Sequence, residues 1–183
     1  MSQRLKQKTK GITGRQHISD GNNGSCGRCY EERPDKTPWG LSTAIDLYGC
    51  PKESLTDPNA SRLLEGFFPA LCKKINMQQH GPPVIDKFGE EALHGWSGMQ
   101  FIETSSVTVH LDDKRGEAYV DIFSCKEFDD KKAVEFCRKY WGGQYGSYLT
   151  AERGNGRPIK VHSSGSFGYA ANIESKLGEQ IAV

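Results

Sequence analysis

Residues 96–125 read WSGMQFIETSSVTVHLDDKRGEAYVDIFSC and contain two apolar runs joined by a polar turn. In Val107–Leu111, apolar residues alternate with a threonine and a histidine, which predicts a strand with one buried and one polar face. The turn at Asp112–Gly116 and the run Ala118–Phe123 complete a predicted β-hairpin. The segment also carries a serine pair, a histidine and a cysteine among its packing residues. We therefore interpret it as a candidate reactive centre.

Further strands and two helices are predicted on both sides of this hairpin. The predicted strands are 41–49, 84–88, 98–103 and 145–152. The predicted helices are 59–77, with Leu and Phe at spacings of three and four, and 129–140, which ends before Gly142-Gly143. These elements predict an α+β fold, a two-layer α/β sandwich whose mainly antiparallel sheet has helices on one face. The other sheet face then needs cover, from a second copy or from the tails.

Composition predicts one domain with tails. No apolar run approaches the length of a membrane span, and the net charge of +1 gives the whole chain no strong attraction for nucleic acid or anionic lipid. Residues 1–38 form a predicted disordered basic tail rich in Gly and Asn, because they lack the apolar pattern that would offset the entropy of ordering. The folded domain is predicted over 39–154, and a weakly patterned C-terminal segment over 155–183.

Six cysteines and no recognisable export signal favour a reducing cytoplasm in which the thiols are not paired. Cys26 and Cys29 form a Cys-x-x-Cys, which is half of a zinc site, a redox pair or an incidental pair in the tail. A structural zinc site needs about four ligands, and a second close pair is absent from the sequence. We therefore expect no metal. An accessory role for the basic tail in binding metal or nucleic acid is the weakest of the functional hypotheses.

Known catalytic motifs do not account for the reactive residues. The sequence has no Gly-x-Ser-x-Gly turn, no glycine-rich phosphate loop of the Walker or dinucleotide type and no His-Glu-x-x-His. What remains is Thr104-Ser105-Ser106, which places two hydroxyl groups beside a peptide bond at the start of a predicted strand.

Several positions agree in order and spacing with the pattern of a known family. They are Tyr48-Gly49-Cys50 at the end of the first strand, Ser97-Gly98 opening a later one, Ser105 five positions before His110 and twenty before Cys125, and the lead-in Val120–Ser124. In these residues the chain resembles the small prokaryotic S-adenosylmethionine decarboxylase proenzymes, a pyruvoyl-dependent family. The resemblance covers residues 41–154.

The resemblance implies self-cleavage between Thr104 and Ser105, which turns Ser105 into a pyruvoyl group. That group would form a Schiff base with the substrate amine and act as an electron sink for decarboxylation of S-adenosylmethionine in polyamine (spermidine) synthesis. Ser97 would assist processing by hydrogen bonding, His110 would remove the α-proton, and Cys125 would return a proton to the substrate. A cytoplasmic homodimer of processed two-chain protomers is also implied.

Two departures from the family pattern keep alternatives open. The family has Glu-Ser-His where this chain has Thr104-Ser105-Ser106, and a regular strand would place Ser106 on the same face as His110. The family also has a ribose-binding glutamate at the position of Lys114. The alternatives are a related pyruvoyl-dependent arginine or ornithine decarboxylase, and a family member that does not process itself and binds a ligand or regulates a partner.

Overall fold

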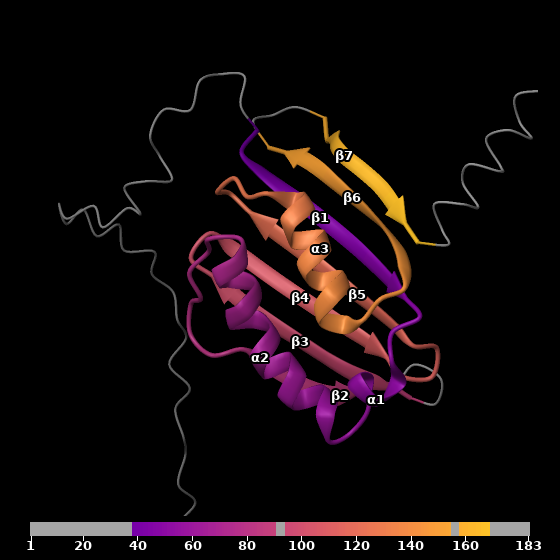
Figure 1. Cartoon of the computed structure of the whole chain (residues 1–183). Coiled ribbons are helices and arrows are strands. Elements are labelled where there is room, and N and C mark those ends of the chain that lie inside the picture. Colours follow the sequence, from indigo (N-terminus) through magenta and orange to yellow (C-terminus); the bar gives the residue numbers. More distant parts are fainter. Residues whose placement is uncertain (1–37, 91–93, 155–157, 169–183) are drawn as a thin grey trace, which may run out of the picture. The chain divides into compact units, whose positions relative to one another are not determined.

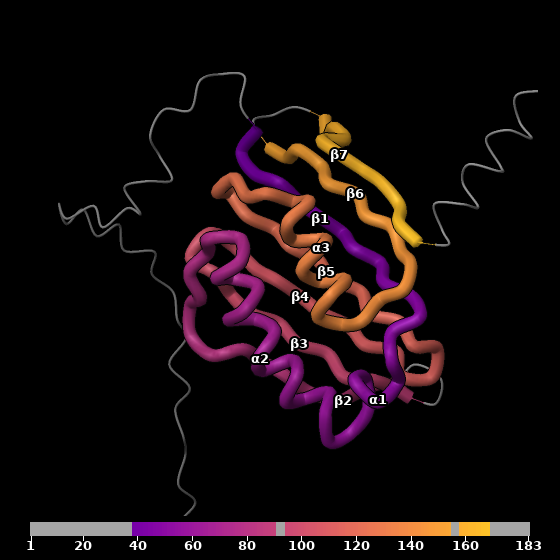
Figure 2. The backbone as a smooth tube through the Cα atoms, viewed as in Figure 1, coloured from indigo at the N-terminus to yellow at the C-terminus, as the bar shows by residue number. Residues whose placement is uncertain are grey.

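The computed structural model describes residues 38–90, 94–154 and 158–168. Within them, seven strands form one antiparallel sheet in the order β2-β3-β4-β5-β1-β6-β7 (Figures 1 and 2). The strands are β1 (Gly40–Tyr48), β2 (Val84–Phe88), β3 (Gly95–Ile102), β4 (Ser105–Asp112), β5 (Glu117–Ser124), β6 (Tyr145–Arg153) and β7 (Lys160–Phe167).

The helices are α1 (Lys52–Leu55), α2 (Asn59–Lys74) and α3 (Asp130–Trp141), and the two longer ones lie against the same face of the sheet (Figure 1). At the start of α3 the Asp129 carboxylate accepts a hydrogen bond from the Lys132 N–H, and the helix ends at Gly142 in the left-handed conformation that glycine favours. The predicted α+β fold, with an antiparallel sheet and helices on one face, is confirmed.

The hydrophobic core fills the space between this inner face of the sheet and the two helices. Phe67 of α2 and Trp141 of α3 are fully buried, with ring centroids 5.3 Å apart. A fully buried large apolar side chain contributes about 1.5–3 kcal/mol to folding. At Gly98 an added Cβ would lie 2.9 Å from the Phe68 ring, so this glycine allows α2 to approach β3 closely. The Ser-Gly dipeptide of the sequence pattern therefore has a packing role beside the site.

Strand β7 is a difference from the sequence prediction, which placed no strand beyond Gly154. It pairs antiparallel with β6 and forms one edge of the sheet. Most of its residues are exposed or half-buried, so the apolar alternation that identifies a strand in sequence is missing. The Ser163 hydroxyl of β7 hydrogen-bonds the Asp130 carboxylate at the start of α3. The first part of the weakly patterned 155–183 segment is thus joined to the sheet.

Two of the remaining expectations concern residues that the structure does not describe. The predicted basic tail, apart from Pro38, and the Cys26/Cys29 pair lie outside the described residues.

Among the described residues, no helix is long and apolar enough to span a membrane. In the same part of the chain, no group of three or more His, Cys, Asp or Glu side chains is arranged to hold a metal ion.

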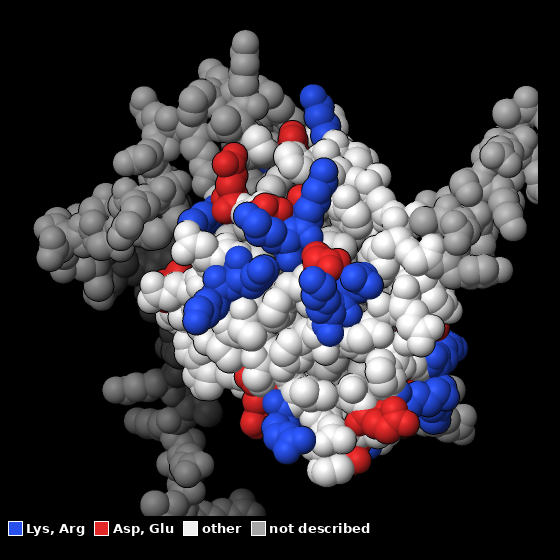
Figure 3. Space-filling model, in the orientation of Figure 1, with Lys and Arg blue, Asp and Glu red and all other residues white. Residues whose placement is uncertain are grey.

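Both sides of the sheet carry charged side chains, and the outer face also exposes apolar ones. The helix side carries charge, with Lys and Arg side chains gathered over α3 (Figure 3). The outer sheet face, which points away from the helices, exposes apolar side chains from three strands. They are Val84 (65% exposed), Phe88 (56%), Phe101 (51%) and Leu149 (45%). Val84, Phe88 and Phe101 lie on the neighbouring strands β2 and β3, and apolar side chains grouped in this way are typical of a surface that another molecule covers.

Candidate active site

A backbone outlier marks the turn between β3 and β4. Ser105 follows this turn and pairs with Ile102 on one side and Ser124 on the other. The backbone φ of Ser105 is 143°, a value that non-glycine residues rarely adopt and that costs on the order of 1–3 kcal/mol. Among the described non-glycine residues, only Asn76 also has a positive φ. The strain therefore falls on the residue that the resemblance assigns to self-cleavage.

Thr104, the residue before Ser105, is held at two points, by Ser124 at the end of β5 and by Cys125 directly after it. The carbonyl oxygen of Thr104 accepts a hydrogen bond of 2.9 Å from the backbone N–H of Cys125. The Thr104 hydroxyl lies 2.9 Å from the Ser124 hydroxyl. The carbonyl is the group that the Ser105 hydroxyl would attack, and negative charge would then develop on its oxygen. An N–H already pointing at that oxygen stabilises such charge.

The segment between α2 and β2 also forms hydrogen bonds with the turn between β3 and β4. The Glu103 N–H donates to the Gln78 carbonyl at 3.0 Å, and the His80 N–H donates to the Phe101 carbonyl at 2.8 Å. Gln100 is fully buried, and its side-chain amide donates to the His80 carbonyl at 3.2 Å. Because these bonds fix both arms of the turn, the strained backbone at Ser105 persists.

Ser97 and His110 form a second polar feature, on the outer face of the sheet. They are register partners across β3 and β4, and Ser97 Oγ lies 2.9 Å from His110 Nδ1. His110 is exposed, whereas its neighbours Val109 and Leu111 are buried on the inner face. The predicted alternation of β4 is therefore confirmed, and it directs the histidine away from the helices.

A hollow of about 250 Å³ lies beside this pair. The residues that line it are Phe88, His94, Gly95, Ser97, His110, Leu111, Asp112, Arg115 and Tyr119. Lys114, which the resemblance placed at the ribose-binding position, is not among these lining residues. Asp112 is, and its carboxylate accepts a hydrogen bond of 2.9 Å from the Arg115 N–H. A carboxylate thus lies next to the serine and histidine.

The two features lie at opposite ends of β4. His110 is five positions after Ser105, and an extended strand rises about 3.4 Å per residue, so about 17 Å lies between them. One chain brings Thr104, Ser105 and Cys125 together and brings Ser97 and His110 together. Within one chain, however, the Ser105 group and the Ser97–His110 pair remain apart.

The competing serine, Ser106, lies in a different environment. It is the register partner of Phe101 on β3 and of Phe123 on β5. Phe101 is exposed on the outer face, so Ser106 occupies the same face as His110, as a regular strand predicts. The backbone strain lies at Ser105 and not at Ser106.

Sequence reasoning missed three residues that contact the turn. They are Ser124, whose hydroxyl reaches Thr104, the buried Gln100, and Met77, whose sulfur lies 3.3 Å from the Thr104 hydroxyl. Ser124 had a usable signal, because it falls on the same strand face as the apolar Val120 and Ile122. A polar residue at a core position must find a partner there.

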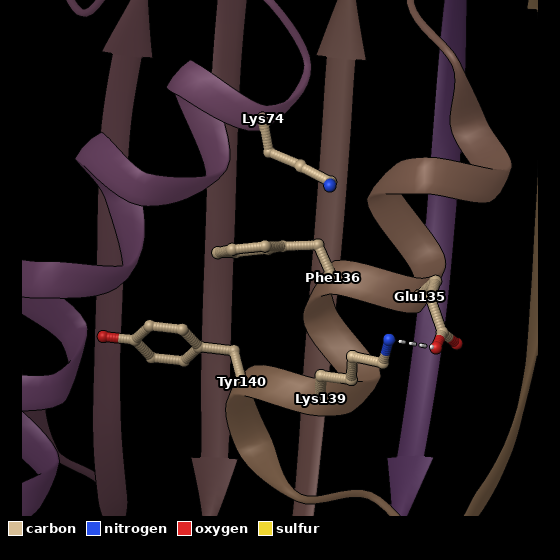
Figure 4. A pocket seen from close by; sticks show the side chains of 5 residues that line it. All are labelled: Lys74, Glu135, Phe136, Lys139 and Tyr140. Carbon is tan, nitrogen blue, oxygen red and sulfur yellow. Dashed lines mark ion pairs between the residues drawn. The ribbon is translucent and has the colours of Figure 1, made fainter.

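A second hollow, of about 260 Å³, lies on the helix side between α2 and α3 (Figure 4). It is lined by Lys74, Glu135, Phe136, Lys139 and Tyr140, and within it the Lys139 ammonium pairs with the Glu135 carboxylate at 3.1 Å. None of the predicted site residues lines it, and His110 lies on the opposite face of the sheet. We therefore locate the candidate active site at strands β3, β4 and β5 and not at this hollow.

Carboxylates and tyrosines occupy the outer face next to Tyr119. Burial raises the pKa of Asp46 above its ordinary value of 3.8, and repulsion from Asp121 and Glu117 raises it further, against a lowering by the Tyr48 hydroxyl. Tyr119 donates a hydrogen bond of 2.5 Å to Glu117. This part of the outer face is therefore an acidic environment in which negative charge is repelled.

We expect Asp46→Asn to raise the melting temperature at pH 7. A carboxyl whose pKa is raised on folding favours the folded state while protonated and opposes it once ionised, so the wild type loses stability as pH rises through the folded pKa of Asp46. The asparagine variant avoids this loss. Thermal unfolding followed from pH 7 towards pH 4 should show the advantage shrinking. An advantage that stays constant with pH would contradict this prediction.

Comparison with known proteins supports these assignments of fold and family. Residues 41–154 match the family model described as S-adenosylmethionine decarboxylase. A proenzyme of that name from Pyrococcus furiosus is 27% identical over 63% of this chain and 78% of its own length. The Geobacillus kaustophilus proenzyme of the same name is 27% identical over 67% of this chain and 92% of its own.

A solved structure shares the fold. The adenosylmethionine decarboxylase of Aquifex aeolicus superposes with a TM-score of 0.52 and 23% identity, over 64% of this chain and 92% of that one. Fold and family match together place the protein in the carboxy-lyase class. The chain belongs to the S-adenosylmethionine decarboxylase family, and the resemblance found in the sequence is confirmed.

Proposed function

We propose that this protein is a pyruvoyl-dependent S-adenosylmethionine decarboxylase of polyamine synthesis that cleaves itself between Thr104 and Ser105. The observation that carries the proposal is the strained Ser105 directly after a carbonyl held by the Cys125 N–H. The names of the family's proenzymes support self-cleavage, since a proenzyme is a precursor that matures.

Self-cleavage needs only groups that the chain itself carries. The Ser105 oxygen bonds to the Thr104 carbonyl carbon and the C–N bond breaks, which leaves an ester and a free amine on residue 105. Removal of the α-proton of residue 105 then expels the Thr104 carboxylate and leaves a dehydroalanine. Its imine tautomer takes up water, releases ammonia and becomes a pyruvoyl group. The products are chains 1–104 and 105–183.

The residues around Ser105 fit a pyruvoyl group. The position is half-buried, the group is made from the serine itself, and the Cys125 N–H remains beside it. The group supplies an electron sink for the carbanion that decarboxylation leaves. We assign the return of a proton to the substrate carbon to Cys125, which follows Ser124, the register partner of Ser105.

A homodimer completes the site in this proposal. His110 is the proposed base for removal of the α-proton, yet about 17 Å of strand separates it from Ser105 of the same chain. The outer face exposes apolar side chains on β2 and β3, which provide a surface for a second copy. If two outer faces stack about a two-fold axis that reverses the direction of β4, the Ser105 end of one copy overlies the Ser97–His110 end of the other.

The hollow beside His110 suits a cationic substrate that carries hydroxyl groups. The Asp112 carboxylate accepts hydrogen bonds from hydroxyls and attracts positive charge, and Phe88 offers an exposed ring for stacking. S-adenosylmethionine has a sulfonium charge, a ribose and an adenine. In this chain we therefore assign to Asp112 the acceptor role that the family gives to its glutamate.

Release of labelled carbon dioxide tests the reaction. Purified protein incubated with carboxyl-labelled S-adenosylmethionine should release the label, and borohydride reduction of the protein with its substrate should stop the release by trapping the substrate on chain 105–183. Protein that is cleaved but releases no carbon dioxide from S-adenosylmethionine would contradict the substrate assignment.

Arginine or ornithine is the second candidate substrate. The observation that favours it is the acidic group on the outer face, Asp46, Glu117 and Asp121, where burial and then repulsion raise the pKa of Asp46. A guanidinium or ammonium would relieve that repulsion. Release of carbon dioxide from labelled arginine or ornithine in the same assay would establish this alternative.

We place the enzyme in the cytoplasm. The described cysteines, Cys50, Cys72, Cys125 and Cys137, form no disulfide, and all are buried. Burial raises the pKa of Cys50 and of Cys72 to about 11, which keeps both thiols protonated and unreactive at neutral pH. Unpaired thiols are usual in a reducing compartment.

A further inference from the structure

We infer that Ser124 is a positioning residue for self-cleavage, and that it acts by fixing the side chain of Thr104. The inference rests on the proposed cleavage between Thr104 and Ser105. The family pattern has a glutamate before the cleaved serine. In this chain Thr104 occupies that position, and its hydroxyl pairs with the hydroxyl of Ser124.

The geometry is a two-point clamp on Thr104 made by consecutive residues. The Ser124 and Thr104 hydroxyls hydrogen-bond each other at 2.9 Å, and the Cys125 N–H donates to the Thr104 carbonyl at 2.9 Å. Ser124 is itself fixed: it is fully buried, its oxygen accepts a hydrogen bond of 3.0 Å from the Lys126 N–H, and its hydroxyl lies 2.8 Å from the Lys126 carbonyl. The Met77 sulfur lies 3.3 Å from the Thr104 hydroxyl and 3.8 Å from the Ser124 hydroxyl.

Two anchor points restrict rotation of the carbonyl that is attacked. With the Cys125 bond alone, Thr104 could pivot about its carbonyl oxygen. With its side chain also held, the bond between its Cα and its carbonyl carbon keeps one orientation. The strained φ of Ser105 needs such restraint, because a free turn would relax to an ordinary conformation. The clamp therefore keeps Ser105 and the carbonyl in the conformation from which attack begins.

The clamp acts on the first step of processing and not on the second. Bond formation between Ser105 Oγ and the Thr104 carbonyl carbon depends on the orientation of that carbonyl. Removal of the α-proton from residue 105 depends on the base, which we have assigned to His110. Loss of the Ser124 hydroxyl should therefore slow formation of the ester, whereas loss of the His110 imidazole should let the ester accumulate.

The test compares Ser124→Ala with Ser124→Thr in the full-length chain. Ser124→Ala should slow the conversion of precursor to chains 1–104 and 105–183 by between about tenfold and a hundredfold, followed by intact mass. Ser124→Thr retains the hydroxyl and should recover most of the rate. Hydroxylamine, which cleaves esters, should release chain 1–104 rapidly from His110→Ala precursor and slowly from Ser124→Ala precursor.

Thr43 supplies the matched control. Its hydroxyl lies 3.0 Å from the Thr150 hydroxyl, both residues are fully buried, and they pair between β1 and β6 of the same sheet. Thr43→Val should lower the melting temperature and leave the cleavage rate unchanged. A folded Ser124→Ala variant that cleaves at the wild-type rate, or slowing by Thr43→Val as large as by Ser124→Ala, would overturn the inference. Failure of the wild type to cleave would instead overturn the proposed function.

Discussion

Ser105→Ala should abolish self-cleavage and with it the decarboxylase activity. The variant lacks the hydroxyl that attacks the Thr104 carbonyl and the oxygen through which the chain is cut. We expect the rate of cleavage to fall by at least about a thousandfold, the loss typical of removing a nucleophile. Intact mass should show one uncut chain, and no carbon dioxide should be released from S-adenosylmethionine.

Ser106→Ala is the matched control, because it removes the neighbouring hydroxyl. Ser106 lies opposite Phe101 in the regular part of β4, and the backbone strain lies one residue earlier, so this variant should still cleave after Thr104. Cleavage lost in Ser106→Ala and retained in Ser105→Ala would assign the reaction to the other serine.

Two inactive variants should restore activity when they are expressed together. Ser105→Ala lacks the attacking group and His110→Ala lacks the base, and no chain in the mixture carries both. In a dimer whose sites combine Ser105 of one copy with His110 of the other, each mixed dimer has one complete site. With random pairing, about a quarter of wild-type activity and cleavage should return. Intact mass and the labelled substrate both report it.

The control pairs His110→Ala with the double variant Ser105→Ala/His110→Ala, a mixture that contains no histidine at this position and should stay inactive. Absence of recovery in the first mixture, with mixed dimers demonstrated by differently tagged chains, would contradict a shared site. It would mean that Ser105 and His110 act within one chain, against the strand geometry.

Local sequence patterns predicted most of the fold correctly. The alternation of β4, the apolar stripe of α2 and the Asp129 and Gly142 caps of α3 each leave a signal over a few neighbouring residues. Strand β7 left none, because an edge strand with both faces largely exposed needs no apolar alternation. Its place depends on pairing with β6, which sequence alone does not show.

The candidate site was predictable as a set of residues but not as an arrangement. Spacing in the sequence identified Ser97, Ser105, His110 and Cys125 through the family resemblance. It did not show that the rise of β4 separates Ser105 from His110, or that Ser124 holds Thr104 across the turn. Nor did the sequence show which residue near position 114 faces the hollow. Asp112 lines it, and Lys114 does not.

Intact mass of the purified wild-type protein tests self-cleavage most directly. We predict two fragments that correspond to residues 1–104 and 105–183, the second with a pyruvoyl group in place of the serine and therefore resistant to Edman degradation. A single uncut species at 20.3 kDa, in protein that is folded, would contradict the central claim.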